Sequence, residues 1–337
     1  MQSARAIDPA EWRAAVEPFE RSSLARSLGQ LATSVLPYLL LWVAMPLSLR
    51  VSYWLTLPLA LTAAGFLVRS FIVCHDCGHG AFFRSRLANR VVGYLTGLIA
   101  FLPSTGWSQE HARHHAGSGN LDRRGDGDIW TLTVAEYRAA SRARRLAYRL
   151  YRHPLVLLGL GPLYVFLLNY RFWHRGEGKR ARWSKVWTNL GLAVIALAAS
   201  LTIGLRAYLA IQLPVILLAG TAGIWLFYVQ HQFEGTYWKR TGDWDYLDQA
   251  LAGASFYRLP RLLQWLTGNI GYHHIHHLSP RVPNYFLQSC HESSPLFQAV
   301  PPLTLRASLR CLRFRLWDED AGRLVGFAAA RAVPALA

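Results

Sequence analysis

The sequence predicts an all-α integral membrane protein, with four transmembrane helices in two hairpins and additional cytoplasmic and interfacial helices. Three observations predict this fold class. Hydrophobic residues make up 52% of the chain and charged residues only 16%, whereas a soluble domain carries about a quarter charged residues. Four stretches are apolar for about the 20 residues that a bilayer crossing requires. The basic residues behind the net charge of +17 lie mainly between these stretches.

The four predicted spans form two pairs, each with a very short connection. Ser48–Arg50 connects the first pair and Arg206–Ala207 the second. Connections this short require the two helices of each pair to run antiparallel as a hairpin. The spans are expected at Leu31–Leu47, Val51–Val73, Val186–Leu205 and Tyr208–Tyr228.

The distribution of basic residues predicts the orientation of the hairpins. Each short connection carries a single arginine, whereas the segment from Arg113 to Lys185, the N-terminus and the region after Lys239 are rich in basic residues. By the positive-inside rule, both hairpins enter the inner membrane from the cytoplasm and leave the middle segment and both termini inside. Because the charge lies beside apolar runs, it favours an anionic membrane surface as the partner and argues against nucleic acid.

Two shorter apolar stretches, Val91–Pro103 and Leu155–Leu168, contain glycine and proline. Their length predicts re-entrant or surface-lying helices rather than spans. The first apolar stretch begins only near Leu31, after several acidic residues, so it is expected to stay in the membrane rather than to be cleaved. The predicted organisation is a cytoplasmic N-terminal segment at 1–30, a membrane domain at 31–291 and a cytoplasmic C-terminal tail at 292–337.

Ten of the thirteen histidines form three groups and one outlier. The groups are HDCGH beginning at His75, HARHH beginning at His111 and HHIHH beginning at His273, while His231 stands alone at the end of the fourth span. Helical residues three and four apart share a face, with about 5–6 Å between their Cβ atoms. The histidines expected to converge are His75, His79, His111, His114, His115, His231, His273, His276 and His277.

This number of histidines predicts two metal ions. Imidazole is a good ligand for several transition metals, and one metal has room for about six ligands. A single group is also typical of polar histidines with ordinary partners, but three groups at membrane boundaries favour a metal site. His274 lies off the shared face and is expected beside the ligands. His153, His174 and His291 fit no pattern and are expected on the surface or in loops.

The cysteines predict neither a zinc site nor a disulfide scaffold. Cys74 and Cys77 form one CxxC motif that overlaps the first histidine group, and no second CxxC exists to complete a zinc site. The four cysteines of the chain are too few and too scattered for a disulfide framework.

The order of the motifs HDCGH, HxRHH and HxxHH, placed around two hairpins, resembles the membrane fatty acid desaturases. Three further segments, Phe227–Trp238, Gly268–Tyr285 and Asp126–Tyr137, are similar to bacterial acyl-lipid desaturases. The resemblance extends from about Leu31 to His291. It implies that the nine histidines hold a non-haem di-iron centre, which uses O₂ and two electrons to place a cis double bond in a lipid acyl chain. It implies no catalytic side chain beyond the metal ligands.

The resemblance also implies an external electron donor. A fused cytochrome b₅ domain would show His-Pro-Gly-Gly, but here His153-Pro154 continues as Leu-Val. A separate donor such as ferredoxin is therefore expected. One hypothesis is that the basic cytoplasmic face receives an acidic donor. The alternative is that the arginines only enforce topology and bind anionic lipid.

Members of the family that act on acyl-CoA hold a water on iron through an asparagine one turn before the lone histidine. Phe227 occupies that position here. Asn269 is a candidate for the same role, with helix capping as the alternative.

Carboxylates next to the motifs are candidates for orienting the histidine rings. Asp76 and Glu234 are favoured over the others, for which solvation is the alternative. Regioselectivity requires a narrow apolar tunnel beside the metals. Aromatic residues are candidates for its lining, with ordinary packing or a place in the interfacial aromatic belt as the alternatives. The remaining carboxylates are Glu110, Asp126 and Asp128, and the aromatic candidates are Trp107, Trp130 and Tyr228.

Two other functions are compatible with the histidine pattern. A carotenoid ketolase or hydroxylase, or a fatty acid hydroxylase, would use the same metal cage. A non-catalytic metal-binding or transport protein would need charged groups inside the spans, which carry only Arg69 near one end. The sequence carries no signal for double-bond position, acyl chain length, acyl carrier (glycerolipid, CoA or carrier protein) or oligomeric state.

Overall fold

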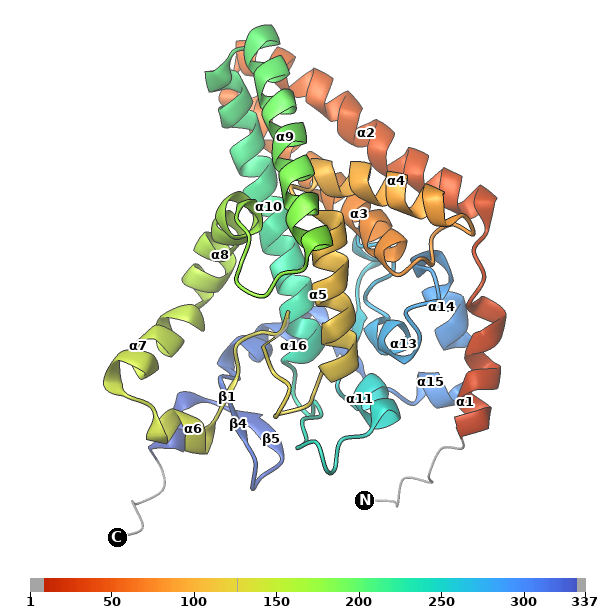
Figure 1. Ribbon diagram of the computed structural model, residues 1–337, viewed down its shortest axis with the longest axis vertical. Coiled ribbons are helices and arrows are strands. Elements are labelled where there is room, and N and C mark those ends of the chain that lie inside the picture. Colours follow the sequence, from red (N-terminus) through yellow and green to blue (C-terminus); the bar gives the residue numbers. More distant parts are fainter. Residues whose placement is uncertain (1–8, 126, 332–337) are drawn as a thin grey trace.

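The computed structural model describes residues 9–125 and 127–331 and is mostly helical (Figure 1). Four helices within these residues are long and apolar enough to cross a membrane, as predicted. They form two consecutive pairs, and α2, α9 and α10 extend away from the short helices and strands at the opposite end of the molecule (Figure 1). The four helices are α2 (Leu24–Val51), α3 (Tyr53–Gly78), α9 (Lys179–Thr202) and α10 (Leu205–His231).

The hairpin turns do not lie where the sequence predicts them. Ser48–Arg50 belongs to α2, and the break falls at Ser52, whose extended backbone ends α2. The hydroxyl of Ser52 accepts a hydrogen bond from the amide of Trp54 in the first turn of α3. Arg206 and Ala207 belong to α10, and the second break falls at Gly204, whose φ of +87° favours glycine. The prediction was wrong because a single arginine does not end a helix, whereas a capping serine or a left-handed glycine does.

The two helices of the first hairpin differ in how much of their surface is covered. In the most apolar stretch of α3, 56% of the residues are buried, compared with 17% in α2. α2 leaves large aliphatic side chains such as Leu40 and Val43 exposed, which suits contact with lipid. α3 packs between α2, α4 and α10, so the histidines at its end are held in the interior.

Neither of the two shorter apolar stretches forms a straight span. The first lies mainly in the amphipathic helix α4 (Arg86–Ile99), which begins with the cap of Ser85. The second follows α7 (Arg142–Tyr151) and consists of π-helical turns at Val156–Leu160 and Tyr164–Leu168 around the short α8 (Gly161–Leu163). α7 and this segment meet at an angle of 64°, the geometry of a broken span or a re-entrant loop.

The remaining elements form the part of the molecule that carries the histidine motifs. Two of its helices, α5 and α13, hold the second and third motifs, and two small sheets join distant parts of the chain. One sheet has the order β1-β4-β5 and the other pairs β2 with β3. The helices are α1 (Pro9–Val16), α5 (Ser104–Gly117), α6 (Val134–Ala139), α11 (Tyr246–Ala252), α12 (Arg261–Leu266), α13 (His273–Leu278), α14 (Asn284–Glu292), α15 (Pro295–Gln298) and α16 (Leu305–Ser308). The strands are β1 (Leu132–Thr133), β2 (Phe256–Arg258), β3 (Pro302–Thr304), β4 (Leu316–Asp318) and β5 (Arg323–Val325).

The C-terminal segment after α15 is held against the rest of the protein by buried hydrogen bonds and apolar contacts. The guanidinium of Arg152, which is fully buried, donates hydrogen bonds to the Phe314 carbonyl at 2.8 Å and to Oε1 of Gln232 at 2.9 Å. Leu316 and Trp317 are also buried. This segment therefore closes the end of α10 next to the histidines.

Candidate metal centre

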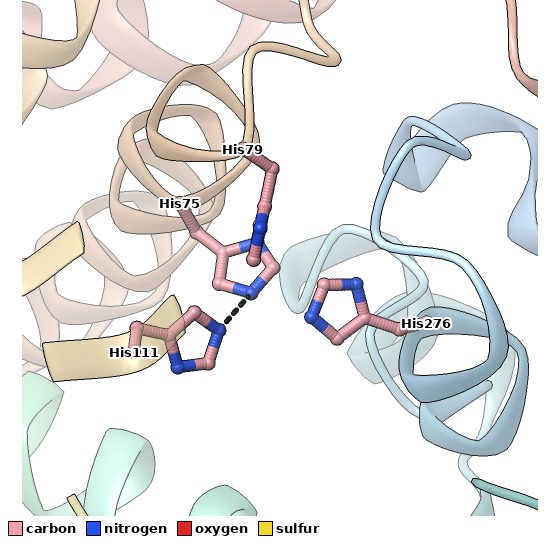
Figure 2. A group of neighbouring side chains, drawn as sticks. All are labelled: His75, His79, His111 and His276. Carbon is pink, nitrogen blue, oxygen red and sulfur yellow. Dashed lines mark hydrogen bonds between the residues drawn. The ribbon is translucent and has the colours of Figure 1, made fainter. Parts of the chain in front are cut away.

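Four helices bring all nine predicted histidines into one cluster. α3 ends at the first motif, α5 carries the second, α13 carries the third and α10 ends at His231. Figure 2 shows four of the rings turned toward one another from three of these helices. Eight of the nine histidines are buried, and His79 is partly exposed. The burial follows from the packing of α3 between its neighbours.

Two sets of histidines have the geometry to share a metal ion. In each set, one ring nitrogen from every residue lies within 4.8 Å of the others. Within the first set, Nε2 of His75 lies 3.0 Å from Nε2 of His111. The first set is His75, His79, His111 and His276, and the second is His114, His231 and His277.

The two other predicted histidines join these sets. Nε2 of His115 lies 3.2 Å from Nε2 of His111, and its ring stacks on His277 with 4.2 Å between centroids. Nε2 of His273 lies 3.0 Å from Nε2 of His231. His115 therefore lies between the two sets and His273 lies beside the second.

The spacing of the nitrogens fits metal ligation. Two nitrogens bound to one ion at about 2.1 Å and at a right angle lie about 3.0 Å apart, which is close to the separations of the paired Nε2 atoms. The Nε2 atoms of His79, His276 and His277 are buried and have no hydrogen-bond partner among the described residues. A buried polar nitrogen without a partner is destabilising, and a bound cation would supply one. The residues therefore fit a pair of transition-metal ions.

The protonation state of the cluster also suits a metal. Burial lowers the pKa of six of these imidazoles, and the neighbouring histidines lower it further, so these six rings are neutral and each can offer a lone pair. The pKa lies well below its ordinary value for His79, His111, His115, His273, His276 and His277.

Two carboxylates orient histidine rings. Nδ1 of His75 lies 2.9 Å from Oδ1 of Asp76, and Nδ1 of His114 lies 2.7 Å from Oδ1 of Asp128. Because a carboxylate only accepts, each Nδ1 carries the proton and donates it, which leaves Nε2 free to bind a metal. The prediction for Asp76 matches this geometry, and Asp128 has the same role.

Neutral groups orient two further rings. Nδ1 of His231 donates to the Gly253 carbonyl at 3.2 Å. The amide of Gln249 lies 3.3 Å from Nδ1 of His277, and Gln249 is fully buried. Neither contact is predicted from the sequence, because α11 and the glycine that follows it carry no motif and only the fold places them beside the histidines.

The prediction for Glu234 was wrong, and the other candidates of this region have different positions or lie outside the described residues. Glu234 is exposed and contacts no histidine of the cluster among the described residues. Asn269 forms a left-handed turn with φ of +58° and donates to the Asn284 carbonyl at 3.3 Å, so its conformation serves the chain reversal before α13. Glu110 lines a cavity, where burial raises the pKa of its carboxyl. Asp126 lies outside the described residues.

The histidines outside the cluster fall into two classes. His153 and His174 are exposed, as predicted. His291 was predicted on the surface but is buried on α14, where its Nδ1 lies 3.0 Å from Nε2 of His274. His274 therefore faces away from the cluster and pairs with His291.

The CxxC motif has a packing role. Cys74 and Cys77 are free and buried. A Cβ placed at Gly97 would lie 3.2 Å from Sγ of Cys74, and one placed at Gly93 would lie 3.0 Å from Cβ of Cys77. The cysteines thus fill the interface where α4 crosses α3.

An apolar cavity of about 470 Å³ begins at the cluster. His75, His111, His114 and His273 form part of its wall, and it continues between α3, α10 and the π-helical segment. Its walls are mostly aliphatic and aromatic, which suits an apolar ligand. The cavity therefore gives such a ligand direct access to the candidate metal centre.

Of the three aromatic residues predicted to line this cavity, only Trp107 does so, and its ring stacks on His111 with 4.6 Å between centroids. Tyr228 is fully buried and donates to the Phe314 carbonyl at 3.1 Å, while Trp130 packs on Tyr148. Both therefore have the packing role that was the alternative.

The family model and three relatives that match this chain are all fatty acid desaturases. The family described as "Fatty acid desaturase" matches residues 52–303. A "Fatty acid desaturase" of Bacillus subtilis is 49% identical over 319 residues, which cover 95% of this chain and 91% of the relative. An "sn-1 oleoyl-lipid 12-desaturase" of Synechocystis is 26% identical over 81% of this chain and 74% of the relative. An "sn-1 acyl-lipid omega-3 desaturase (ferredoxin)" of Nostoc is 26% identical over 71% of this chain and 67% of the relative.

Proposed function

Because the chain belongs to the fatty acid desaturase family and is an oxidoreductase of fatty acid metabolism, we propose that the protein desaturates the acyl chains of membrane lipids. In this proposal its nine clustered histidines bind two irons. The observation that carries the proposal is the convergence of nine imidazoles, eight of them buried and several with unpaired nitrogens, at one end of an apolar cavity.

The chemistry requires a redox-active metal. The C–H bonds of a methylene are too strong for a side-chain acid or base, so a metal and O₂ must supply the oxidant and two electrons must come from a donor. Zinc has no redox chemistry, whereas imidazole also suits iron. The ligands we propose are His75, His79, His111, His114, His115, His231, His273, His276 and His277.

The protein positions the acyl chain and excludes water. The cavity walls next to the histidines are formed by Trp107, Phe71 and Phe227, which present aromatic rings to an acyl chain. Phe227 lies 5.0 Å from the ring of His114 and 5.2 Å from that of His231, between centroids. A methylene held against these rings is oriented toward the metal centre, and orientation of this kind accounts for a large share of enzymatic rate enhancement.

We place the metal centre on the cytoplasmic side of the inner membrane. The hairpin turns at Ser52 and Gly204 are flanked by one arginine each, Arg50 and Arg206. The segments at the opposite end, which carries the histidines, are strongly basic. This bias is that of cytoplasmic segments. In this arrangement the membrane domain extends over 31–291, and segments 1–30 and 292–337 lie in the cytoplasm.

The same basic surface suits an acidic electron donor such as ferredoxin, and the name of the Nostoc relative includes ferredoxin. Charge complementarity would raise the association rate, so turnover should fall as ionic strength rises. Turnover with purified ferredoxin that stays constant across salt concentrations would count against this donor interaction.

Expression in a host without desaturases tests the function. The expected products are lipids with new cis double bonds, identified by mass spectrometry with double-bond mapping, from cells whose purified protein contains about two irons per chain. An added oxygen in place of a double bond would indicate a hydroxylase instead, and retained zinc without O₂ consumption would indicate a non-catalytic metal protein.

A further inference from the structure

The cavity follows one face of α10 away from the metal centre. Residues at helical spacing line it from Gln230 back to Ile216. These two positions are fourteen residues apart, which at about 1.5 Å per residue corresponds to about 21 Å. One leaflet of a bilayer is about 15 Å of hydrocarbon, half of the 30 Å core. The cavity is therefore long enough for the acyl chain of one leaflet.

The part of the cavity that lies farthest from the histidines is apolar. It is lined by Leu67 and Val68 of α3 and by aliphatic residues and glycines of α10. The end at the metal centre also contains Glu110 and Asp128. A polar ester group placed in the apolar part would lose its hydrogen bonds, so the methyl end of an acyl chain belongs there and the head group at the opposite end.

Two glycines of α10 line this part of the cavity and differ in what surrounds them. A Cβ placed at Gly220 would lie 2.8 Å from Cβ of Pro162 and 3.1 Å from the ring of Phe166, so this glycine allows the π-helical segment to pack against α10. A Cβ placed at Gly223 would meet no atom within 4 Å. The packing of the protein therefore does not require a glycine at position 223, and the missing side chain leaves open space in the cavity.

We propose that Gly223 sets how far the methyl end of the acyl chain extends past the metal centre, and so determines which acyl length and which carbon pair are accepted. Gly223 precedes His231 by eight residues, or about 12 Å along the helix. A side chain at this position would shorten the cavity without displacing protein atoms. The inference rests on the proposed desaturase function.

A graded series Gly223→Ala, Gly223→Leu and Gly223→Phe tests the proposal in the desaturase-free host. With growing side chains, the double bond should move toward the methyl end or the product pool should move to shorter acyl chains. A hydrophobic pocket discriminates one methylene by about 10- to 200-fold, so the ratio of short to long products should change by at least about tenfold. Iron content should stay at the wild-type value.

The matched control is Gly29→Leu, because Gly29 is also helical, its Cβ would also meet no atom within 4 Å, and it lies on α2 away from the cavity. This control should keep the wild-type product pattern. An unchanged double-bond position and chain length in active Gly223→Leu protein with full iron would overturn the proposal, as would a shift toward the head group. Absence of double bonds in the wild-type sample would refute the desaturase function instead, so the two failures are distinguishable.

Discussion

Asn284 donates two hydrogen bonds to the same carboxylate oxygen of Asp76, from its backbone amide at 2.6 Å and from its side-chain amide at 2.8 Å. The other oxygen of Asp76 accepts from Nδ1 of His75. These residues lie at the end of α3 and at the start of α14, 208 positions apart in the chain. The contact therefore fixes the first histidine motif against the segment that follows the third.

Asp76→Ala is expected to weaken iron binding. The substitution removes the acceptor that holds the His75 ring and leaves the buried Asn284 amide unpaired. Loss of such an outer partner lowers metal affinity by about 10- to 100-fold, which metal analysis of purified protein after mild chelation would reveal. Glu234→Ala is the control. The side chain of Glu234 is exposed, so this variant protein should retain its iron. Equal iron retention in both variants would show that Asp76 does not support the metal.

Replacing any one of three histidines of the cluster should abolish the activity. We expect His114→Ala, His231→Ala and His276→Ala each to lower product formation by more than about 100-fold, because each removes a direct ligand rather than an outer partner. Lipid profiling and iron content of the same preparations provide the measurement. His174→Ala should behave as wild type because His174 is exposed. Normal product from any of the three cluster variants would exclude that residue as a ligand.

His291→Ala should affect stability rather than iron content. His291 pairs with His274 in a buried site outside the cluster. Removing it leaves a buried ring nitrogen of His274 unsatisfied, which costs about 1–3 kcal/mol. The expected result is a lower thermal unfolding midpoint in detergent, with wild-type iron stoichiometry. Loss of one iron per chain would instead identify the pair as part of the metal centre.

The sequence was sufficient for the spans and the cluster because both depend on local patterns. A run of apolar residues predicts a span, and histidines three or four apart predict a shared face, as at His111 and His115. The hairpin turns also carry local signals, the capping Ser52 and the left-handed Gly204, which the arginines nearby do not indicate. The role of Gln249 depended on information that local patterns lack. Gln249 meets His277 only because α11 packs on α13, and a polar residue in a short helix gives no sign of that contact.

The failure of the prediction for Glu234 has the same origin. Glu234 is only three residues from His231, yet the helix ends at His231 and the chain turns through Gly235, which has φ of +81°. The carboxylate therefore points away from the ring that it follows in sequence. The groups that orient the rings of His231 and His114 come from Gly253 and Asp128, which are 22 and 14 positions away.

Gly271→Ala is expected to displace the third histidine motif. Gly271 lies two residues before His273, and its carbonyl accepts from the Tyr257 amide at 2.7 Å. A Cβ at this position would lie 2.3 Å from the carbonyl oxygen of Tyr257, and because this neighbour is backbone rather than a flexible side chain, the chain must move. Overpacking of this kind costs about 1–3 kcal/mol, and a shift of α13 moves three histidines at once. We expect reduced iron content together with reduced product. Gly242→Ala is the control, since its Cβ would meet no atom within 4 Å. If Gly271→Ala retained full iron and activity, the close approach of β2 to the start of α13 would not be what positions this motif.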